Sequence, residues 1–201
     1  YDVLALEDGR IAVALGDVAG HGVSSGLVMA AAKSALAVQA AADPRIDAVF
    51  RTLNGMVFQT ARKRLLTTLC YALLDPKARS LDFACAGHFG PYRLGLGGAL
   101  ESLESIAYPL GVRDRLEVRV RNAFLEPGDT LFFFSDGIVE AVPDGRDEPF
   151  GFERLERVLK GQGGEPPGVL LETVTAAVAG YTGAAPRQDD QTLLAMSLPS
   201  T

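Results

Sequence analysis

A glycine-rich stretch that follows an apolar run constrains this chain more than any other feature. Ile11–Leu15 is entirely apolar and predicts a buried strand, and the Ala/Leu/Val-rich segment 23–42 predicts a long helix. Between them, Asp17 is the first charged residue after the strand, and the neighbouring glycines allow backbone to approach a ligand closely. Two interpretations are open from this stretch alone: a site for a cation or phosphate, or only a turn, since Asp beside Gly is common in turns.

Composition and length exclude several classes of protein. A chain of 201 residues is long enough for one domain with a substantial core, and its net charge of −6 argues against nucleic-acid binding. Two cysteines without a CxxC motif exclude a disulfide framework or zinc ribbon and fit a cytoplasmic location. The apolar run Leu27–Ala42 contains Lys33 and Gln39 and is shorter than the ~20 residues of a membrane span, so we expect no membrane insertion.

The remaining patterns predict hairpins and helices. Asp8-Gly9 predicts a hairpin between strands at 3–6 and 11–15. In a second hairpin, of strands 67–74 and 81–86, a register that pairs Asp75 with Ser80 places Cys70 opposite Cys85, and we expect two reduced thiols. We expect helix 23–42 to be buried on most sides, and a second helix to begin at Asp43-Pro44 and to end in Arg62-Lys63-Arg64. Further strands are expected at 92–94, 99–103, 116–124, 130–134 and 193–198, and helices at 152–159 and 166–179.

Acidic residues stand at the ends of three apolar strands. Asp17 follows the first strand, Asp136 follows strand 130–134, and Asp189 and Asp190 precede strand 193–198. Adjacent antiparallel strands can bring these ends to one rim, where clustered carboxylates repel one another and their pKa values rise unless cations neutralise them. Oxygen ligands without convergent His or Cys favour Mg²⁺ or Mn²⁺ over zinc. Two such ions ~4 Å apart lower the pKa of a bridging water and bind a phosphoryl group, so the pattern indicates metal-dependent phosphoryl chemistry.

Four segments together carry a resemblance to a known family. They are Gly16-Asp17-Val18-Ala19-Gly20-His21-Gly22, Ala86-Gly87-His88 with Pro91, Gly128-Asp129 followed by Phe134-Ser135-Asp136-Gly137-Ile138-Val139-Glu140-Ala141, and Asp189-Asp190-Gln191-Thr192. In their order and spacing, the chain resembles the SpoIIE/RsbU-like branch of the PP2C (PPM) metal-dependent serine/threonine phosphatases over essentially its whole length. Tyr1-Asp2 resembles the end of the family's opening Gly-Gly-Asp-x-Tyr-Asp, so we expect an N-terminally truncated output domain of a longer sensor protein.

The resemblance implies a fold and a set of ligands. The fold is α+β, a four-layer α-β-β-α sandwich of two mainly antiparallel sheets flanked by helices, in a single phosphatase domain over residues 1–201. Asp17 corresponds to the carboxylate that bridges two metals, and the backbone carbonyl of Val18 to a further ligand. Asp136 and Asp189 correspond to ligands of the second and first metal, with Gly137 and Asp190 beside them. A metal-bound hydroxide is then expected to attack phosphorus.

The resemblance also implies an activity and partners. We expect a phosphatase for phosphoserine and phosphothreonine that requires two Mn²⁺ or Mg²⁺ ions. Its substrate is expected to be a phosphorylated anti-sigma-factor antagonist, a STAS domain, in bacterial partner switching. An upstream sensor domain and a second copy in a homodimer are the other expected partners.

Two departures from the family pattern and two alternatives stay open. His21 lies four residues after Asp17, where the eukaryotic branch has a His two residues after its Asp, and Phe89 replaces the Asn that follows the equivalent of His88. Catalytic and structural roles are both open for these histidines. The alternatives are a catalytically inactive regulatory binding module and a serine hydrolase, since Gly22-Val23-Ser24-Ser25-Gly26 matches the Gly-x-Ser-x-Gly nucleophile motif.

Overall fold

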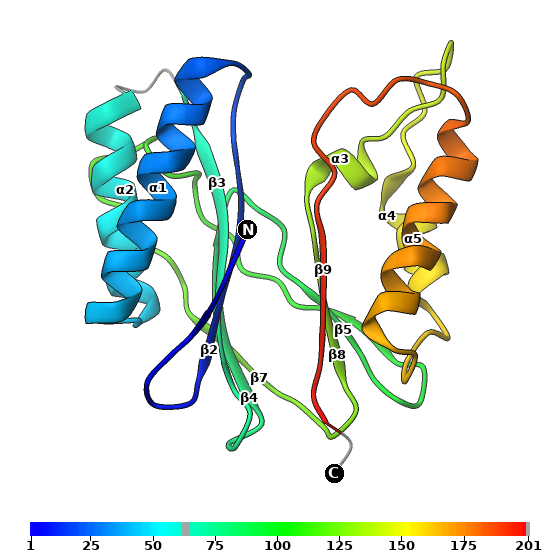
Figure 1. Cartoon of the computed structure of the whole chain (residues 1–201), viewed down its shortest axis with the longest axis horizontal. Helices are drawn as coiled ribbons and strands as arrows, with labels where there is room; N and C mark the ends of the chain where they lie inside the picture. The colour runs from blue at the N-terminus through cyan, green and yellow to red at the C-terminus, as the bar shows by residue number, and fades with distance from the viewer. Residues whose placement is uncertain (62–64, 200–201) are drawn as a thin grey trace. The chain divides into compact units, whose positions relative to one another are not determined.

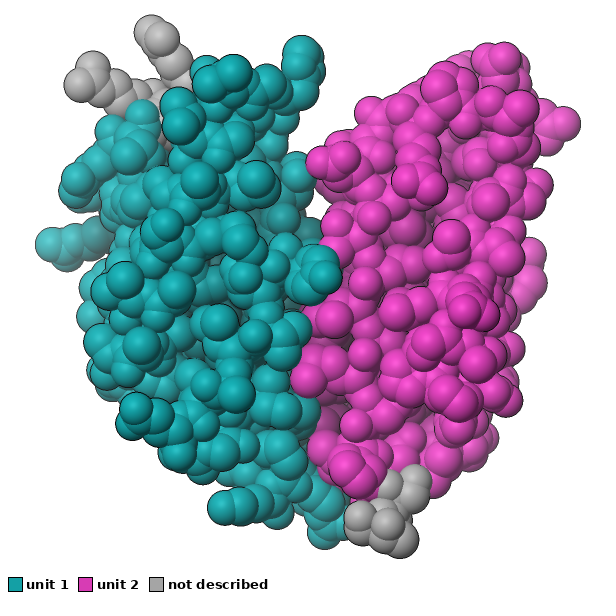
Figure 2. Space-filling view, viewed as in Figure 1, with its two compact units in different colours: residues 1–90, 104–124 teal, residues 91–103, 125–201 magenta. Residues whose placement is uncertain are grey.

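The computed structural model describes residues 1–61 and 65–199, and it divides the chain into two compact units. Unit 1 comprises residues 1–90 and 104–124, and unit 2 comprises residues 91–103 and 125–201 (Figure 2). Each unit has its own sheet and its own helices. The predicted basic cluster Arg62-Lys63-Arg64 lies outside the described residues.

Unit 1 is a five-stranded antiparallel sheet with two helices on one face (Figure 1). The strand order is β1-β2-β3-β4-β7, with β1 at Asp2–Ala5, β2 at Ile11–Val18, β3 at Thr67–Asp75, β4 at Ser80–Ala86 and β7 at Arg121–Phe124. Helices α1 (Val23–Ala42) and α2 (Ile46–Ala61) pack against each other and against the sheet. Apolar residues of α2 at helical spacing, such as Val49, Leu53 and Val57, form the core with residues of β2 and β3.

The two hairpins of unit 1 have the predicted registers. β1 and β2 are joined through the Asp8-Gly9 turn, where the Asp8 carboxylate accepts hydrogen bonds from Arg10. In the β3–β4 hairpin, Asp75 pairs with Ser80 and Cys70 pairs with Cys85. Both cysteines are buried free thiols. Local turn sequences therefore determine the strand pairing here.

Helix α1 is much less buried than its composition indicates. Only Ser25, Val28, Leu36 and Ala40 are buried, whereas Val38 is 73% exposed. The prediction of a helix buried on most sides is wrong because α1 packs along one face only. Among the described residues, α1 is also one helix that, by length and composition, is long and apolar enough to cross a membrane. The helix has 20 residues, so it is longer than the apolar run Leu27–Ala42 on which the sequence-based argument against a membrane span relied. A single helix of this kind is weak evidence of a membrane span.

Two other boundaries in unit 1 differ from the prediction. Helix α2 begins at Ile46, not at Pro44, because the Asp43 carboxylate accepts from the Arg45 backbone amide and forms a turn before the helix. The strand expected over 116–124 is limited to β7, at Arg121–Phe124. Before it, the Arg119 carbonyl accepts a hydrogen bond from the Ser105 hydroxyl, so the backbone is paired with a different segment.

Unit 2 is a four-stranded antiparallel sheet with helices packed on one face (Figure 1). The strand order is β6-β5-β8-β9, with β5 at Tyr92–Leu94, β6 at Leu100–Ser102, β8 at Thr130–Phe134 and β9 at Leu193–Ser197. The helices are α3 (Asp136–Val139), α4 (Gly151–Leu159) and α5 (Pro167–Thr182). All five residues of β8 are buried, as the sequence predicts, and Phe132 and Phe134 form a core with Leu155 and Val174.

The Gly128-Asp129 motif has a structural role. Asp129 is buried, and its carboxylate accepts hydrogen bonds from the Arg93 side chain, at 2.6 Å, and from the Glu126 backbone amide, at 2.8 Å. It thereby fixes the turn into β8 and ties it to β5. With these two units, the expected α+β class of two mainly antiparallel sheets flanked by helices is confirmed.

Candidate active site

Asp17 and Val18 lie in unit 1, at the end of β2. Both residues still pair with β3, so the strand extends three residues beyond the predicted apolar run. The close approach of β2 to β3 requires glycine at position 16, because a Cβ there would collide with the Thr68 carbonyl oxygen. Asp17 is therefore held at a fixed position of a paired strand, and a turn-only role for it is inconsistent with this pairing.

A threonine links Asp17 to a histidine. The Asp17 backbone amide donates to Thr68 Oγ1 at 3.1 Å, and Thr68 Oγ1 lies 2.9 Å from His88 Nδ1. Because the threonine hydroxyl accepts from the amide, its own proton is available to a neutral imidazole. His88 is buried, with 9% of its surface exposed, and this contact holds its ring beside the end of β2. His21, in contrast, is exposed.

Ser24 lacks the surroundings of a nucleophile. It is an exposed residue of the first turn of α1, and among the described residues it has no hydrogen bond to a histidine. The neighbouring Ser25 donates its hydroxyl to the Gly22 carbonyl at 3.0 Å. Since a serine nucleophile requires an adjacent general base, this geometry does not favour the hydrolase alternative.

In unit 2, the structure brings Asp136 and the Asp189-Asp190 segment together. Ser135, which is buried, donates its hydroxyl to the Asp190 carbonyl at 3.0 Å and accepts from the Thr192 amide at 2.9 Å. Its own backbone amide donates to the Thr192 carbonyl. We call these three bonds the Ser135 clasp. They join the end of β8 to the segment that enters β9, although 55 residues separate Ser135 from Asp190.

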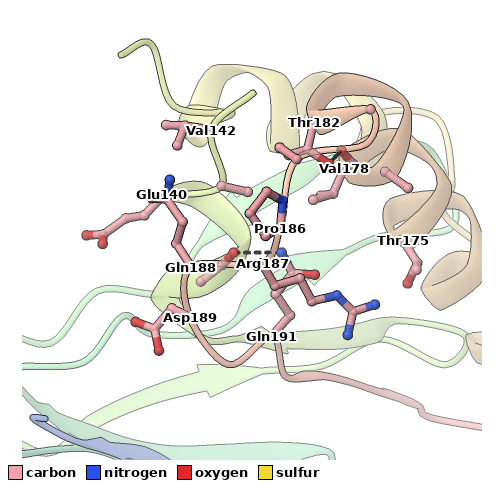
Figure 3. A pocket seen from close by; sticks show the side chains of 15 residues that line it. Glu140, Val142, Thr175, Val178, Thr182, Pro186, Arg187, Gln188, Asp189 and Gln191 are labelled. Atoms are coloured by element: carbon pink, nitrogen blue, oxygen red, sulfur yellow. Dashed lines mark hydrogen bonds between the residues drawn. The ribbon is translucent and has the colours of Figure 1, made fainter. Parts of the chain in front are cut away.

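Gly137 and Gln191 tighten the same junction. A Cβ at position 137 would collide with the Asp190 carbonyl, so only glycine allows the start of α3 to lie against this segment. The Gln191 side-chain amide donates to the Gly137 carbonyl at 3.1 Å, the dashed line in Figure 3. The predicted neighbours Gly137 and Asp190 are thus in direct contact. Ser135 and Gln191 stand within the quoted motifs but were not predicted as site residues, although Ser135 directly precedes Asp136 at the end of a buried strand.

The carboxylates of unit 2 fit a divalent cation. Asp136 Oδ1 accepts from the Gly137 amide at 3.0 Å, and Asp189 Oδ1 accepts from the Asp190 amide at 2.7 Å. Within the described residues, the Oδ2 atoms of both side chains have no hydrogen-bond partner and are available as ligands. Such hard oxygen donors are the ligands that Mg²⁺ and Mn²⁺ prefer. No group of three or more His, Cys, Asp or Glu side chains arranged for a metal is found in the described part of the chain.

Solved structures share this fold. The SiaA-PP2C domain of Pseudomonas aeruginosa is 24% identical, with a TM-score of 0.82 over 93% of this chain and 75% of that one. The RsbU and RsbW domains of Rv1364c from Mycobacterium tuberculosis are 27% identical, with a TM-score of 0.80 over 99% of this chain and 56% of that one. The fold is that of a PP2C-type phosphatase domain.

The family follows from a sequence comparison. Residues 7–199 match the model of the family described as Stage II sporulation protein E (SpoIIE), and the chain belongs to this family. A curated relative, phosphoserine phosphatase RsbU of Bacillus subtilis (strain 168), is 28% identical over 131 residues. This match covers 65% of the chain but only 39% of that relative. The resemblance inferred from the four motifs is therefore confirmed.

Proposed function

We propose that this domain is a metal-dependent protein phosphatase that hydrolyses phosphoserine and phosphothreonine. The observation that carries the proposal is the junction in unit 2, where the Ser135 clasp and Gly137 hold Asp136 and Asp189 on adjacent segments. A phosphoserine phosphatase among the relatives of the chain supports the same activity.

The proposed ligands are those that the family resemblance implies: Asp17, the Val18 carbonyl, Asp136 and Asp189. We propose two Mn²⁺ or Mg²⁺ ions as cofactors, and a neighbour of the same fold, RsbX, which was solved in complex with magnesium, supports a divalent cation. When bound, divalent ions lower the pKa of water and withdraw charge from a phosphoryl group. The residues of this chain hold the ligands in place: Thr68 fixes the Asp17 backbone, and the Ser135 clasp fixes the segment of Asp189.

The proposed substrate is a phosphorylated anti-sigma-factor antagonist of the STAS type, in bacterial partner switching. The relative named RsbU, and a neighbour that combines RsbU and RsbW domains, support this context. A neighbour described as part of a bacterial stressosome agrees with it. We further propose that residues 1–201 act as one cytoplasmic phosphatase domain, controlled by an upstream sensor domain and able to form a homodimer.

Hydrolysis of p-nitrophenyl phosphate with and without Mn²⁺ tests the proposed function. We expect Mn²⁺-dependent turnover and a loss of about 10²-fold or more in kcat for Asp136→Asn, because an electrostatic contribution to the transition state is removed. Asp144→Asn, an exposed aspartate of the same unit, is the matched control and should keep full activity. Turnover without metal, or an unchanged Asp136→Asn variant, would contradict the mechanism.

The same assay separates the alternatives. A protein that binds a phosphorylated partner but hydrolyses neither it nor the aryl phosphate is an inactive regulatory module. Loss of esterase activity in Ser24→Ala, with phosphatase activity unaffected, would instead identify a serine hydrolase.

A further inference from the structure

A pocket in unit 2 directly adjoins the proposed metal ligands. Its volume is about 390 Å³, and it lies between the end of α3, the last turns of α5 and the segment that leads to β9 (Figure 3). Gly137 and Asp189 are among its lining residues. A phosphorylated residue whose phosphoryl group lies at Asp189 therefore brings its own neighbours in sequence to this pocket. The pocket belongs entirely to unit 2.

The wall formed by α5 combines two aliphatic residues with two threonines. Val178 is buried and lines the pocket together with Ala179. Two threonines of the same wall, Thr175 and Thr182, donate their hydroxyl protons to carbonyls of their own helix, at 2.8 Å and 3.1 Å. Their hydroxyl protons are therefore not available to a ligand. This wall suits the aliphatic part of a side chain.

The charged residues of the pocket lie on different sides. In Figure 3, the carboxylates of Glu140 and Asp189 point to one side, and the Arg187 guanidinium extends to the other, toward α5. Arg187 makes no hydrogen bond or ion pair with any residue that the structure describes, and it is the one basic residue that lines the pocket there. A guanidinium without a partner binds a carboxylate through two parallel hydrogen bonds.

We propose that this pocket binds an acidic side chain next to the phosphorylated residue of the substrate, and that Arg187 is the residue that selects it. The proposal rests on the phosphatase function proposed above. An acidic side chain is repelled by Glu140 and attracted by Arg187, so the pocket orients it, and its aliphatic stem packs on Val178. Because the chain has a net charge of −6, its overall field does not attract an acidic segment, and a local cation has to provide the preference.

Phosphoserine peptides test this specificity. On an alanine background, a single glutamate or lysine is placed in turn at each of the three positions on either side of the phosphoserine. With Mn²⁺, we expect glutamate at one position to raise kcat/KM about tenfold over lysine, the difference that one charge-assisted hydrogen-bonded pair supplies. Arg187→Gln should remove the preference, and Arg187→Glu should reverse it. Arg157→Gln, an exposed arginine of α4 outside the pocket, should change nothing.

A second variant tests the pocket itself. Ala179→Leu keeps a helix-forming residue in α5 but fills the pocket, so it should lower kcat/KM for the glutamate peptide by a larger factor than kcat/KM for the aryl phosphate. If the aryl phosphate is hydrolysed normally but no peptide shows a preference that depends on Arg187, the pocket assignment is wrong while the phosphatase function stands.

If the wild-type protein hydrolyses nothing, the proposed function fails, and fluorescence anisotropy with the same labelled peptides still decides the pocket assignment. Tighter binding of a glutamate peptide that is lost in Arg187→Gln supports it, and equal binding of all peptides overturns it.

Discussion

The Ser135 clasp gives the sharpest prediction about how this site is built. Replacing Ser135 by Ala removes one hydroxyl and leaves the Asp190 carbonyl and the Thr192 amide without their side-chain partner, while the backbone bond between Ser135 and Thr192 stays. Thr at position 135 keeps the hydroxyl and should rescue the loss. Neither substitution changes any of the proposed metal ligands.

The size of the effect follows from the two lost bonds. Ser135 has only 6% of its surface exposed, so water replaces the hydroxyl poorly, and leaving its partners unsatisfied should lower the free energy of unfolding by about 1–3 kcal/mol. If the clasp holds Asp189 in position for the cation, the same free energy reappears in metal binding. Mn²⁺ affinity should then fall by about 5- to 150-fold.

Urea denaturation and calorimetric titration with Mn²⁺ measure these two quantities. The matched control is Ser197→Ala, which removes the hydrogen bond between the Thr130 and Ser197 hydroxyls, 2.7 Å apart, near the other end of the same strand pair. It should lower stability without changing Mn²⁺ affinity. The positioning role of Ser135 would be refuted if Ser135→Ala bound Mn²⁺ as tightly as the wild type does. It would also be refuted if Ser197→Ala lost as much Mn²⁺ affinity as Ser135→Ala.

Two further predictions concern unit 1. Asn54 is buried, its side chain accepts a hydrogen bond from the Gly111 amide, and it donates to two carbonyls of the following loop. Asn54→Ala should therefore lower the free energy of unfolding, measured by urea denaturation, by about 2–4 kcal/mol. A decrease of less than about 1 kcal/mol would show that other contacts hold the loop. Burial raises the pKa of Tyr71 to about 12, whereas its pKa in the unfolded chain is near 10. As the pH rises above about 10, the unfolded state therefore loses the proton first, and the free energy of unfolding falls by up to about 3 kcal/mol. Tyr71→Phe, which loses the bond to the Pro44 carbonyl, should be less stable at neutral pH but should lack this alkaline decrease, and parallel pH profiles of the two proteins would contradict the assignment.

The features that the sequence predicts well are local. The pairing of Cys70 with Cys85 follows from one turn, because hairpin register depends on the residues that close the loop. The positions of Asp136 and Asp189 at strand ends are read from apolar runs in the same way. In contrast, the length of β7 depends on whether residues before Arg121 find a partner strand, and no pattern within the segment shows that Ser105 occupies its backbone.

Other features depend on contacts between distant segments. The apolar composition of α1 predicts burial on most sides, but its neighbours cover only one face, and Val38 stays exposed. The role of Ser135 depends on a carbonyl 55 residues away, and the pocket beside Asp189 depends on where the end of α5 meets the segment of Arg187. Periodicity reports the type of an element, whereas these contacts are set by tertiary packing.

The paired cysteines of the β3–β4 hairpin, Cys70 and Cys85, can be used to follow local opening of unit 1. The hydrogen bond to Cys85, together with burial, raises the pKa of Cys70 well above its usual value, so its thiol resists alkylation while β3 and β4 stay paired. The chain has two cysteines, and both lie in unit 1. The rate at which an alkylating reagent labels the native protein therefore reports how often these two thiols become exposed.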